Sequence, residues 1–321
     1  MSPGVLSRIR SQAARVSDTA RHVRLDEASL AVLAEDFRRD AVPASALDPA
    51  RRWLGDDDTT LAFVLTLDAI NFGSGWFPEV VKRPGMSGYF TIATNLEEAF
   101  TRDGAFSADD LCAFTGERAA RLLGQPRGRG PVDELMDLFA RALADLGHFL
   151  VEHYDGSFRG PVDDAGGCAE RLVELLASMP LYRDVSFYAD EEVPFYKRAQ
   201  ITVSDLAGAF AGAGLGAFRD LDRLTLFADN LVPHVFRRAG ALVYSEKLAS
   251  HIDAEKLLPA GCPEEVEIRA VAVHAAERMV AMLAERGCET SARVLDGWLW
   301  TRGQHPDVKA APRHRTRTSY Y

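Results

Sequence analysis

The sequence predicts a mainly α-helical fold, built as a single compact domain with few or no short strands. Apolar residues recur at helical spacing over several long segments, whereas the alternating patterns typical of strands are rare. The chain also lacks the motifs GxGxxG and GxxxxGKS/T, which mark the commonest nucleotide-binding sheets. A doubly wound parallel sheet is therefore not expected.

The composition is that of a folded chain with an acidic surface. Of the 321 residues, 47% are hydrophobic and 26% are charged, which allows a sizeable core and argues against disorder. No stretch approaches eighteen uninterrupted apolar residues, so no membrane span is expected. The net charge of −10 disfavours a sequence-independent grip on duplex nucleic acid, although it is compatible with one small phosphate site.

The first half of the chain contains two clear helical segments. Residues 107–123 begin with Ser107 as a helix N-cap, and residues 132–152 carry a long apolar stripe. The apolar run 61–67 fits either a buried strand or a buried helix, because its length does not decide between them. Residues 1–19 lack the apolar core of a secretory signal and are expected to form an exposed first helix.

The second half continues the helical pattern. Shorter helices are predicted at 168–178 and 202–210, and the clearest helix of the chain at 264–286. Residues 304–321 are basic and have no apolar stripe, so we expect a flexible tail there. Residues 20–303 are then assigned to one helical domain.

The cysteines give no sign of a metal site or a disulfide framework. They are scattered along the chain without the spacing of zinc ligands, at Cys112, Cys168, Cys262 and Cys288. We therefore expect reduced thiols in a cytoplasmic protein that uses no metal or other cofactor.

Residues 67–78 are unusual for a pure scaffold. Asp68 and Asn71 interrupt a strongly apolar context, and burial of a carboxylate without partners costs free energy. Phe72 and Trp76 offer flat faces on which a ring could stack. The alternative is that Asp68 caps a neighbouring turn and that the aromatic side chains belong to the core.

A second unusual segment holds two adjacent cations. Lys197 and Arg198 lie between aromatic residues and an apolar helix, where they could bind a phosphate through charge-assisted hydrogen bonds. The alternative is a surface pair that is bridged to Asp205 or to the acidic residues at 190–192.

A third segment places Asp229 inside the apolar run 226–234, next to Phe227 and Asn230. Enzymes poise an acid, a base or a cation stabiliser as a partly buried carboxylate beside aromatic side chains. His234 could be its partner. The alternative is that Asp229 only caps the turn before Pro233.

A Pro/Gly turn at 258–263 leads into the long helix and is similar to the hairpin of helix-hairpin-helix DNA glycosylases. Together with the segments above, the chain resembles the queuosine salvage family of queuosine 5′-phosphate N-glycosylase/hydrolases. The matching strings occur in family order and are LDAINF, PFYKRAQITVSDL, LTLFADNLVPHV with LVYSEKL, PAGCPEEVEIRAVAV and VLDGWLW. One departure is FADNLVPH at 227–234, where many members read FADYRVPQ.

The resemblance implies a mostly helical fold related to DNA glycosylases and hydrolysis of the N-glycosidic bond of queuosine 5′-monophosphate, with release of queuine. It makes Asp229 the catalytic carboxylate at C1′ and Lys197 with Arg198 the ligands of the 5′-phosphate. The remaining residues are expected to contact the substrate: Asp68 on the queuine amine, Phe72, Trp76 and Phe227 on the ring, and Asn71, Asn230 and His234 as polar contacts.

Two other functions fit the same residues. The protein could capture queuine or a related deazapurine without catalysis. It could also be a DNA or RNA glycosylase that acts on a flipped base, although the charge of −10 weighs against this. The expected partner is a small nucleotide, with no stable nucleic-acid complex and no membrane.

Overall fold

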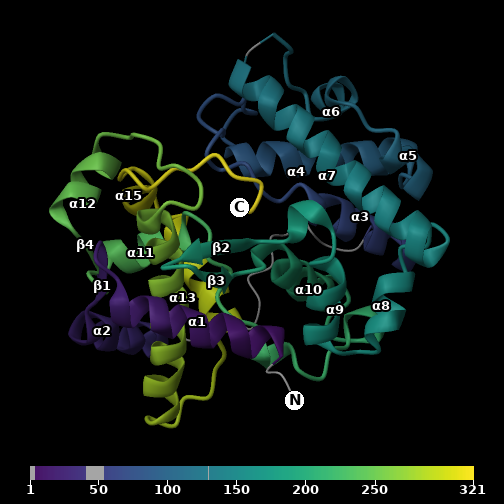
Figure 1. Ribbon diagram of the computed structural model, residues 1–321. Coiled ribbons are helices and arrows are strands. Elements are labelled where there is room, and N and C mark those ends of the chain that lie inside the picture. The colour runs from purple at the N-terminus through teal and green to yellow at the C-terminus, as the bar shows by residue number, and fades with distance from the viewer. Residues whose placement is uncertain (1–3, 41–53, 129) are drawn as a thin grey trace. The chain divides into compact units, whose positions relative to one another are not determined.

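A computed structural model of the protein describes residues 4–40, 54–128 and 130–321. The described chain is mainly helical with four short strands, which confirms the predicted fold class (Figure 1). It divides into two compact units, each assembled from separate stretches of the chain. Their described residues are 4–40, 184–200 and 220–317 in unit 1, and 54–128, 130–183, 201–219 and 318–321 in unit 2.

Unit 1 is organised around its longest helix, α13 (Pro263–Ala284), which packs against α1 (Val5–Thr19) and α2 (Glu27–Arg39). Pro263 in the first turn, followed by two glutamates, is typical of a helix N-terminus because proline fits there and acids complement the helix dipole. The other helices of the unit are α11 (Val232–Arg238), α12 (Glu246–Asp253), α14 (Ala292–Gly303), α15 (Pro306–Lys309) and the short 3₁₀ turn η4 (Leu221–Arg223).

The first helix is present, but it is not simply exposed. Its apolar side chains lie on one face and are buried, namely Leu6, Ile9, Ala13 and Val16. This spacing of three and four residues is that of an amphipathic helix that packs on a core. Residues 1–3 of the predicted segment 1–19 lie outside the described residues.

The strands of unit 1 form two antiparallel pairs. β1 (Val23–Leu25) pairs with β4 (Leu242–Tyr244), and β2 (Val185–Tyr188) pairs with β3 (Glu191–Pro194). The turn between β2 and β3 holds Ala189 and Asp190 at φ angles of 48° and 66°, as a two-residue hairpin of type I′ requires. Strands of three or four residues are too short to produce a clear alternation, which is why the sequence carries few strand signals.

Unit 2 is organised around α7 (Gly130–Tyr154), which packs against α3 (Asp57–Ala69), α5 (Ala108–Cys112) and α6 (Gly116–Leu122) (Figure 1). The ambiguous run 61–67 is helical and lies wholly within buried residues of α3. The remaining helices are α4 (Gly88–Asp103), α8 (Gly160–Ala165), α9 (Ala169–Leu176) and the 3₁₀ turns η2 (Pro180–Tyr182) and η3 (Gly214–Gly216). Helix α10 (Lys197–Ala209) begins in unit 1 and ends in unit 2.

One predicted helix is wrong in its extent. The segment 107–123 was expected to be continuous, but it forms α5 and α6 with a break at residues 113–115. Ser107 caps α5 in a reciprocal capping box with Asp110, as predicted for its N-terminus. Thr115 accepts a hydrogen bond from Arg118 N and begins a second helix, because a capping threonine competes with helix continuation.

The C-terminal residues differ from the flexible tail that the sequence predicts. Leu258 N donates a hydrogen bond of 2.8 Å to Arg315 O, and His314 and Thr316 are buried. In unit 2, Gly73 N donates to Tyr321 O at 3.0 Å. His314, Thr316 and Thr318 are buried, whereas the arginines between them are half-buried. The segment therefore packs through alternate polar side chains and has no apolar stripe.

Three further findings concern the described part of the chain. None of its helices has both the length and the hydropathy of a membrane span. Its His, Cys, Asp and Glu side chains form no group of three placed to hold a metal ion. All four cysteines are free thiols.

Candidate functional site

The residues predicted for the site fall into one group in each unit. Unit 1 contains Lys197, Arg198, Phe227, Asp229, Asn230 and His234. Unit 2 contains Asp68, Asn71, Phe72 and Trp76.

Asp229 begins the turn that leads into α11. Its Oδ1 accepts hydrogen bonds from Leu231 N at 2.7 Å and Val232 N at 3.0 Å, so the capping alternative is realised in the structure. Both bonds go to Oδ1, and Oδ2 accepts none from the described residues. The side chain is half-buried. The carboxylate of Asp229 is therefore fixed to the backbone through one oxygen only.

A second carboxyl group, which is not among the residues predicted for the site, interacts electrostatically with Asp229. Asp296, on α14, is 7% exposed, and its Oδ1 accepts a hydrogen bond of 2.9 Å from Phe227 N. Burial, and next the negative charge of Asp229, raise the pKa of Asp296 well above the ordinary value of an aspartic acid. Paired carboxyl groups in unequal environments are how enzymes separate an acid from a base.

Asp296 could have been found from the sequence. It stands between apolar and aromatic residues in VLDGWLW, the same context that drew attention to Asp68 and Asp229. A buried carboxyl group on a helix needs a hydrogen-bond partner or has a raised pKa, and Asp296 has both.

The raised pKa of Asp296 predicts a specific dependence of stability on pH. The folded protein retains this proton to a higher pH than the unfolded chain, so the free energy of unfolding falls as pH rises above about 4, the ordinary Asp pKa. Asp296→Asn removes this titration. The variant is therefore expected to gain stability relative to the wild type with rising pH, by at most about 1.4 kcal/mol per pH unit, until the folded-state pKa is passed.

Urea unfolding at a series of pH values measures this difference. The exposed Asp222→Asn provides the matched control, whose curve should run parallel to that of the wild type. Parallel curves for Asp296→Asn would contradict the raised pKa.

Cations surround the two carboxyl groups. The positive charges of Lys197 and Arg293 act to lower the pKa of Asp296, against the effect of burial. Burial lowers the pKa of Arg313, and the negative charge of Asp229 acts to raise it. Lys197 is 5% exposed and Arg198 is 1% exposed, so the two cations do not lie on the surface. Unit 1 therefore combines acidic and basic side chains at the start of α10, in the loop before α11, on α14 and in the C-terminal segment.

Two buried polar atoms close to Asp229 in the sequence lack a hydrogen-bond partner among the described residues. They are Nδ2 of Asn230 and Nδ1 of His234. His234 does not bond to Asp229. Its Nε2 donates to Val308 O at 3.0 Å, and its Nδ1 has no partner among the described residues. Burial lowers the pKa of His234 to about 4, so its Nδ1 is an unprotonated acceptor at neutral pH. Unsatisfied buried polar atoms of this kind are completed by ligand or water.

The unit 2 group is built differently. Asn71 Nδ2 donates to Asp68 Oδ1 at 3.0 Å, and both side chains are buried at the end of α3. Phe72 meets Phe139 edge to face at 4.9 Å, and Trp76 is 1% exposed. The indole Nε1 of Trp76 donates to Glu134 Oε2 at 2.8 Å. These contacts favour the alternative in which the aromatic side chains belong to the core.

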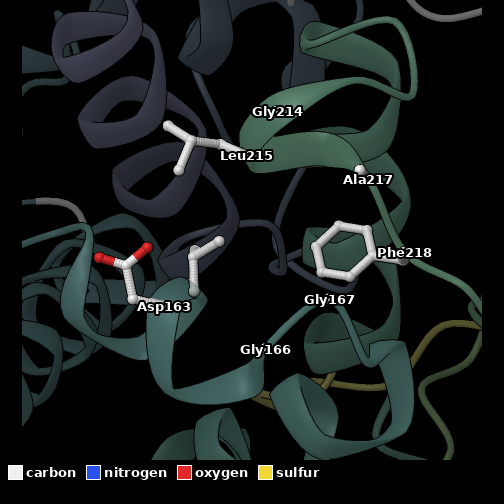
Figure 2. A pocket seen from close by; sticks show the side chains of 8 residues that line it. Asp163, Gly166, Gly167, Gly214, Leu215, Ala217 and Phe218 are labelled. Atoms are coloured by element: carbon white, nitrogen blue, oxygen red, sulfur yellow. The ribbon is translucent and has the colours of Figure 1, made fainter.

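A surface hollow in unit 2 contains none of the predicted residues. It measures about 160 Å³, with Asp163 and Phe218 on opposite sides (Figure 2). Its lining residues are Val162, Asp163, Gly166, Gly167, Gly214, Leu215, Ala217 and Phe218. Sites for drug-sized ligands usually enclose about 300–1,000 Å³, so this hollow is too small for a nucleotide.

Comparison with known proteins gives a consistent result. A family model described as queuosine salvage protein matches residues 52–321. Three curated relatives are each named queuosine 5′-phosphate N-glycosylase/hydrolase. The protein of Sphaerobacter thermophilus is 36% identical over 99% of this chain and 98% of its own. Those of Dictyostelium discoideum and Mus musculus are 32% and 30% identical, over 98% and 95% of this chain and 99% and 98% of their own.

Proposed function

Because the chain belongs to the queuosine salvage protein family, we propose that it hydrolyses the N-glycosidic bond of queuosine 5′-phosphate and releases queuine. The observation that carries this proposal is the pair of carboxyl groups in unit 1, Asp229 and Asp296, which lie among cations and unsatisfied polar atoms. Such a pair suits the cleavage of a glycosidic bond, in which a carboxylate and an acid have separate tasks.

Asp229 acts on the sugar. Cleavage of a ribosyl–base bond builds positive charge at C1′, and a fixed carboxylate stabilises that charge. The two backbone N–H groups that hold Oδ1 orient Oδ2, so little reorganisation is needed when the charge develops. The same oxygen can orient a water molecule or accept its proton.

Asp296 acts on the leaving base. A 7-deazaguanine has no N7 to receive a proton, so its departure needs a proton or hydrogen bond at another base atom. Asp296 is a suitable donor, because burial and the charge of Asp229 raise its pKa and so favour the protonated form. Asn230 Nδ2 and His234 Nδ1 supply a donor and an acceptor for further substrate contacts.

Lys197 and Arg198 bind the 5′-phosphate. Both cations stand in the first turn of α10, where the helix dipole also favours an anion. Phosphate binding then contributes to the orientation of the sugar at C1′. The assignments of Phe227, Asp68, Asn71, Phe72 and Trp76 to the base stay predictions.

We further infer a cytoplasmic protein that acts on a small nucleotide, forms no stable complex with nucleic acid or membrane, and uses no cofactor. The four free thiols and the net charge of −10 support this inference. A duplex-binding assay at moderate salt tests the nucleic-acid part.

Incubation with queuosine 5′-phosphate tests the proposed activity. Chromatography is expected to detect queuine and ribose 5-phosphate in equal amounts, at a rate proportional to enzyme concentration. Asp229→Asn, prepared in parallel, controls for a contaminating hydrolase. Recovery of intact nucleotide bound to the wild-type protein would overturn the enzymatic function and favour a binding protein.

A further inference from the structure

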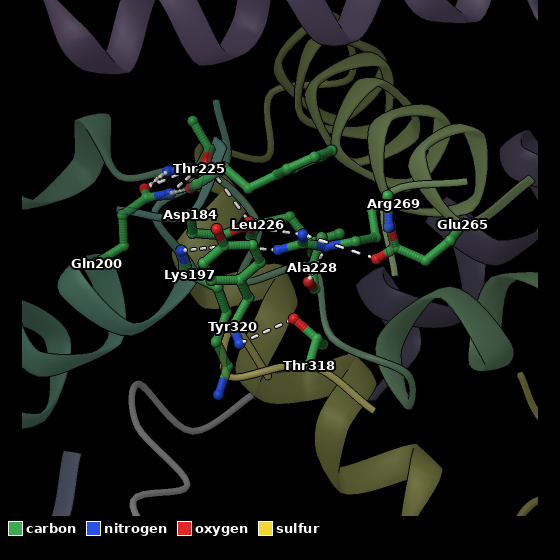
Figure 3. Close-up of polar contacts among 12 residues, drawn as sticks. Asp184, Lys197, Gln200, Thr225, Leu226, Ala228, Glu265, Arg269, Thr318 and Tyr320 are labelled. Atoms are coloured by element: carbon green, nitrogen blue, oxygen red, sulfur yellow. Dashed lines mark hydrogen bonds and ion pairs between the residues drawn. The ribbon is translucent and has the colours of Figure 1, made fainter. Parts of the chain in front are cut away.

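Arg269, on α13, is a fully buried cation of unit 1 (Figure 3). Its guanidinium forms a two-pronged ion pair with Asp184, with Nη1–Oδ1 at 2.9 Å and Nη2–Oδ2 at 2.6 Å. Its Nε donates to Ala228 O at 3.0 Å, and its Cζ lies 3.9 Å from the centre of the Phe195 ring. One rigid, planar group therefore contacts three separate parts of the chain.

The first of these contacts determines where α10 begins. Asp184 O accepts hydrogen bonds from Phe195 N at 2.9 Å and Tyr196 N at 3.2 Å, and Asp184 Oδ2 accepts one from Lys197 N at 3.1 Å. The backbone of Lys197 is thus fixed by the same carboxylate oxygen that Arg269 Nη2 contacts.

The contact with Ala228 holds the loop 225–229 that precedes α11. Ala228 O belongs to the peptide group that joins Ala228 to Asp229, so a shift of this carbonyl moves the Asp229 backbone. Two buried hydrogen bonds between Gln200 and Thr225 make a second connection. Gln200 Oε1 accepts from Thr225 N at 2.8 Å, and Gln200 Nε2 donates to Thr225 Oγ1 at 2.9 Å. The start of α10 and the loop 225–229 are therefore joined at two points.

We propose that Arg269 is a positioning residue that sets the spacing between Lys197, which binds the phosphate, and Asp229, which faces C1′. This inference rests on the proposed function. When Lys197 binds the phosphate of a nucleotide, C1′ faces Asp229 only if the distance between Lys197 and Asp229 is correct. A misplacement of about 1 Å can lower the rate about 100-fold. A nucleoside lacks the phosphate and makes no contact with Lys197, so it can adjust to a change in the spacing between Lys197 and Asp229.

Arg269→Lys tests the proposal, because one ammonium group cannot bond Asp184 by two prongs and Ala228 O at once. The measured quantity is the ratio of kcat/KM for queuosine 5′-phosphate to kcat/KM for queuosine. We expect this ratio to fall about 10-fold or more. A loss of folded enzyme lowers both values equally and leaves the ratio unchanged, so the ratio separates positioning from stability.

Two single variants and one double variant complete the design. Arg278→Lys, on the same helix in an exposed ion pair with Glu27, should leave the ratio at the wild-type value. Asp184→Asn keeps the size of the side chain and should lower the ratio as Arg269→Lys does. It replaces Arg269→Lys as the test if that variant fails to fold. In a Lys197→Ala background, Arg269→Lys should no longer change the ratio, because one of the two anchors is already absent.

The outcomes distinguish this inference from the proposed function. If the wild type releases no queuine, the proposed function fails. If the ratio depends on Lys197 but is the same in the wild type, Arg269→Lys and Asp184→Asn, the function stands and the positioning role of Arg269 is overturned.

Discussion

Replacement of Asp229 by asparagine is expected to remove most of the hydrolysis of queuosine 5′-phosphate and to leave the fold intact. The amide oxygen of asparagine can still accept the hydrogen bonds from Leu231 N and Val232 N, so the turn before α11 is retained. The negative charge at C1′ is lost, and loss of one preorganised electrostatic group typically lowers kcat by about 100- to 1,000-fold. Chromatography of released queuine under saturating substrate measures the change.

Circular dichroism and the melting temperature of Asp229→Asn should match those of the wild type. Asp222→Asn, which alters an exposed carboxylate in the same unit, is the matched control and should retain full activity. Release of queuine by Asp229→Asn at the native rate would show that another residue stabilises the sugar.

Lys197→Ala is expected to raise KM for queuosine 5′-phosphate by about 10- to 100-fold, with little effect on the weaker hydrolysis of queuosine. A hydrogen bond to a charged group contributes about 1.5–3 kcal/mol, which corresponds to this range. Steady-state kinetics on the two substrates measure the selectivity directly.

The exposed Lys247→Ala, on α12, is the control for loss of a positive charge and should not change either KM. Because Lys197 is buried, thermal unfolding of Lys197→Ala is recorded alongside the kinetics. Equal losses on nucleotide and nucleoside would exclude Lys197 from the phosphate site.

The sequence predicted the helices best where an apolar stripe or a cap was long and regular. The stripe in 132–152 corresponds to α7, and the prediction at 264–286 corresponds to α13. The break between α5 and α6 was missed because apolar residues continue in phase across it, while the deciding signal is the single capping residue Thr115. Packing of the C-terminal segment was missed because it rests on backbone pairing at Arg315, which leaves no hydrophobic pattern.

The candidate site was predictable to a similar degree. A carboxylate in an apolar run pointed to Asp229, and adjacent cations pointed to Lys197 and Arg198. The sequence could not distinguish an aromatic side chain that packs in a core from one that binds a ring, as Phe72 and Trp76 illustrate. It also could not reveal Arg269, whose role depends on contacts with residues 85 and 41 positions away along the chain.

The order of segments in unit 1 has a consequence for biosynthesis. Helix α1 packs most extensively against α13, which begins about 240 residues after α1 ends. At translation rates of about 5–20 residues per second, synthesis of α13 begins roughly 10–50 s after synthesis of α1 ends. Over that interval the nascent chain carries an amphipathic helix without its main packing surface, so apolar area that is buried in the folded protein is exposed during synthesis.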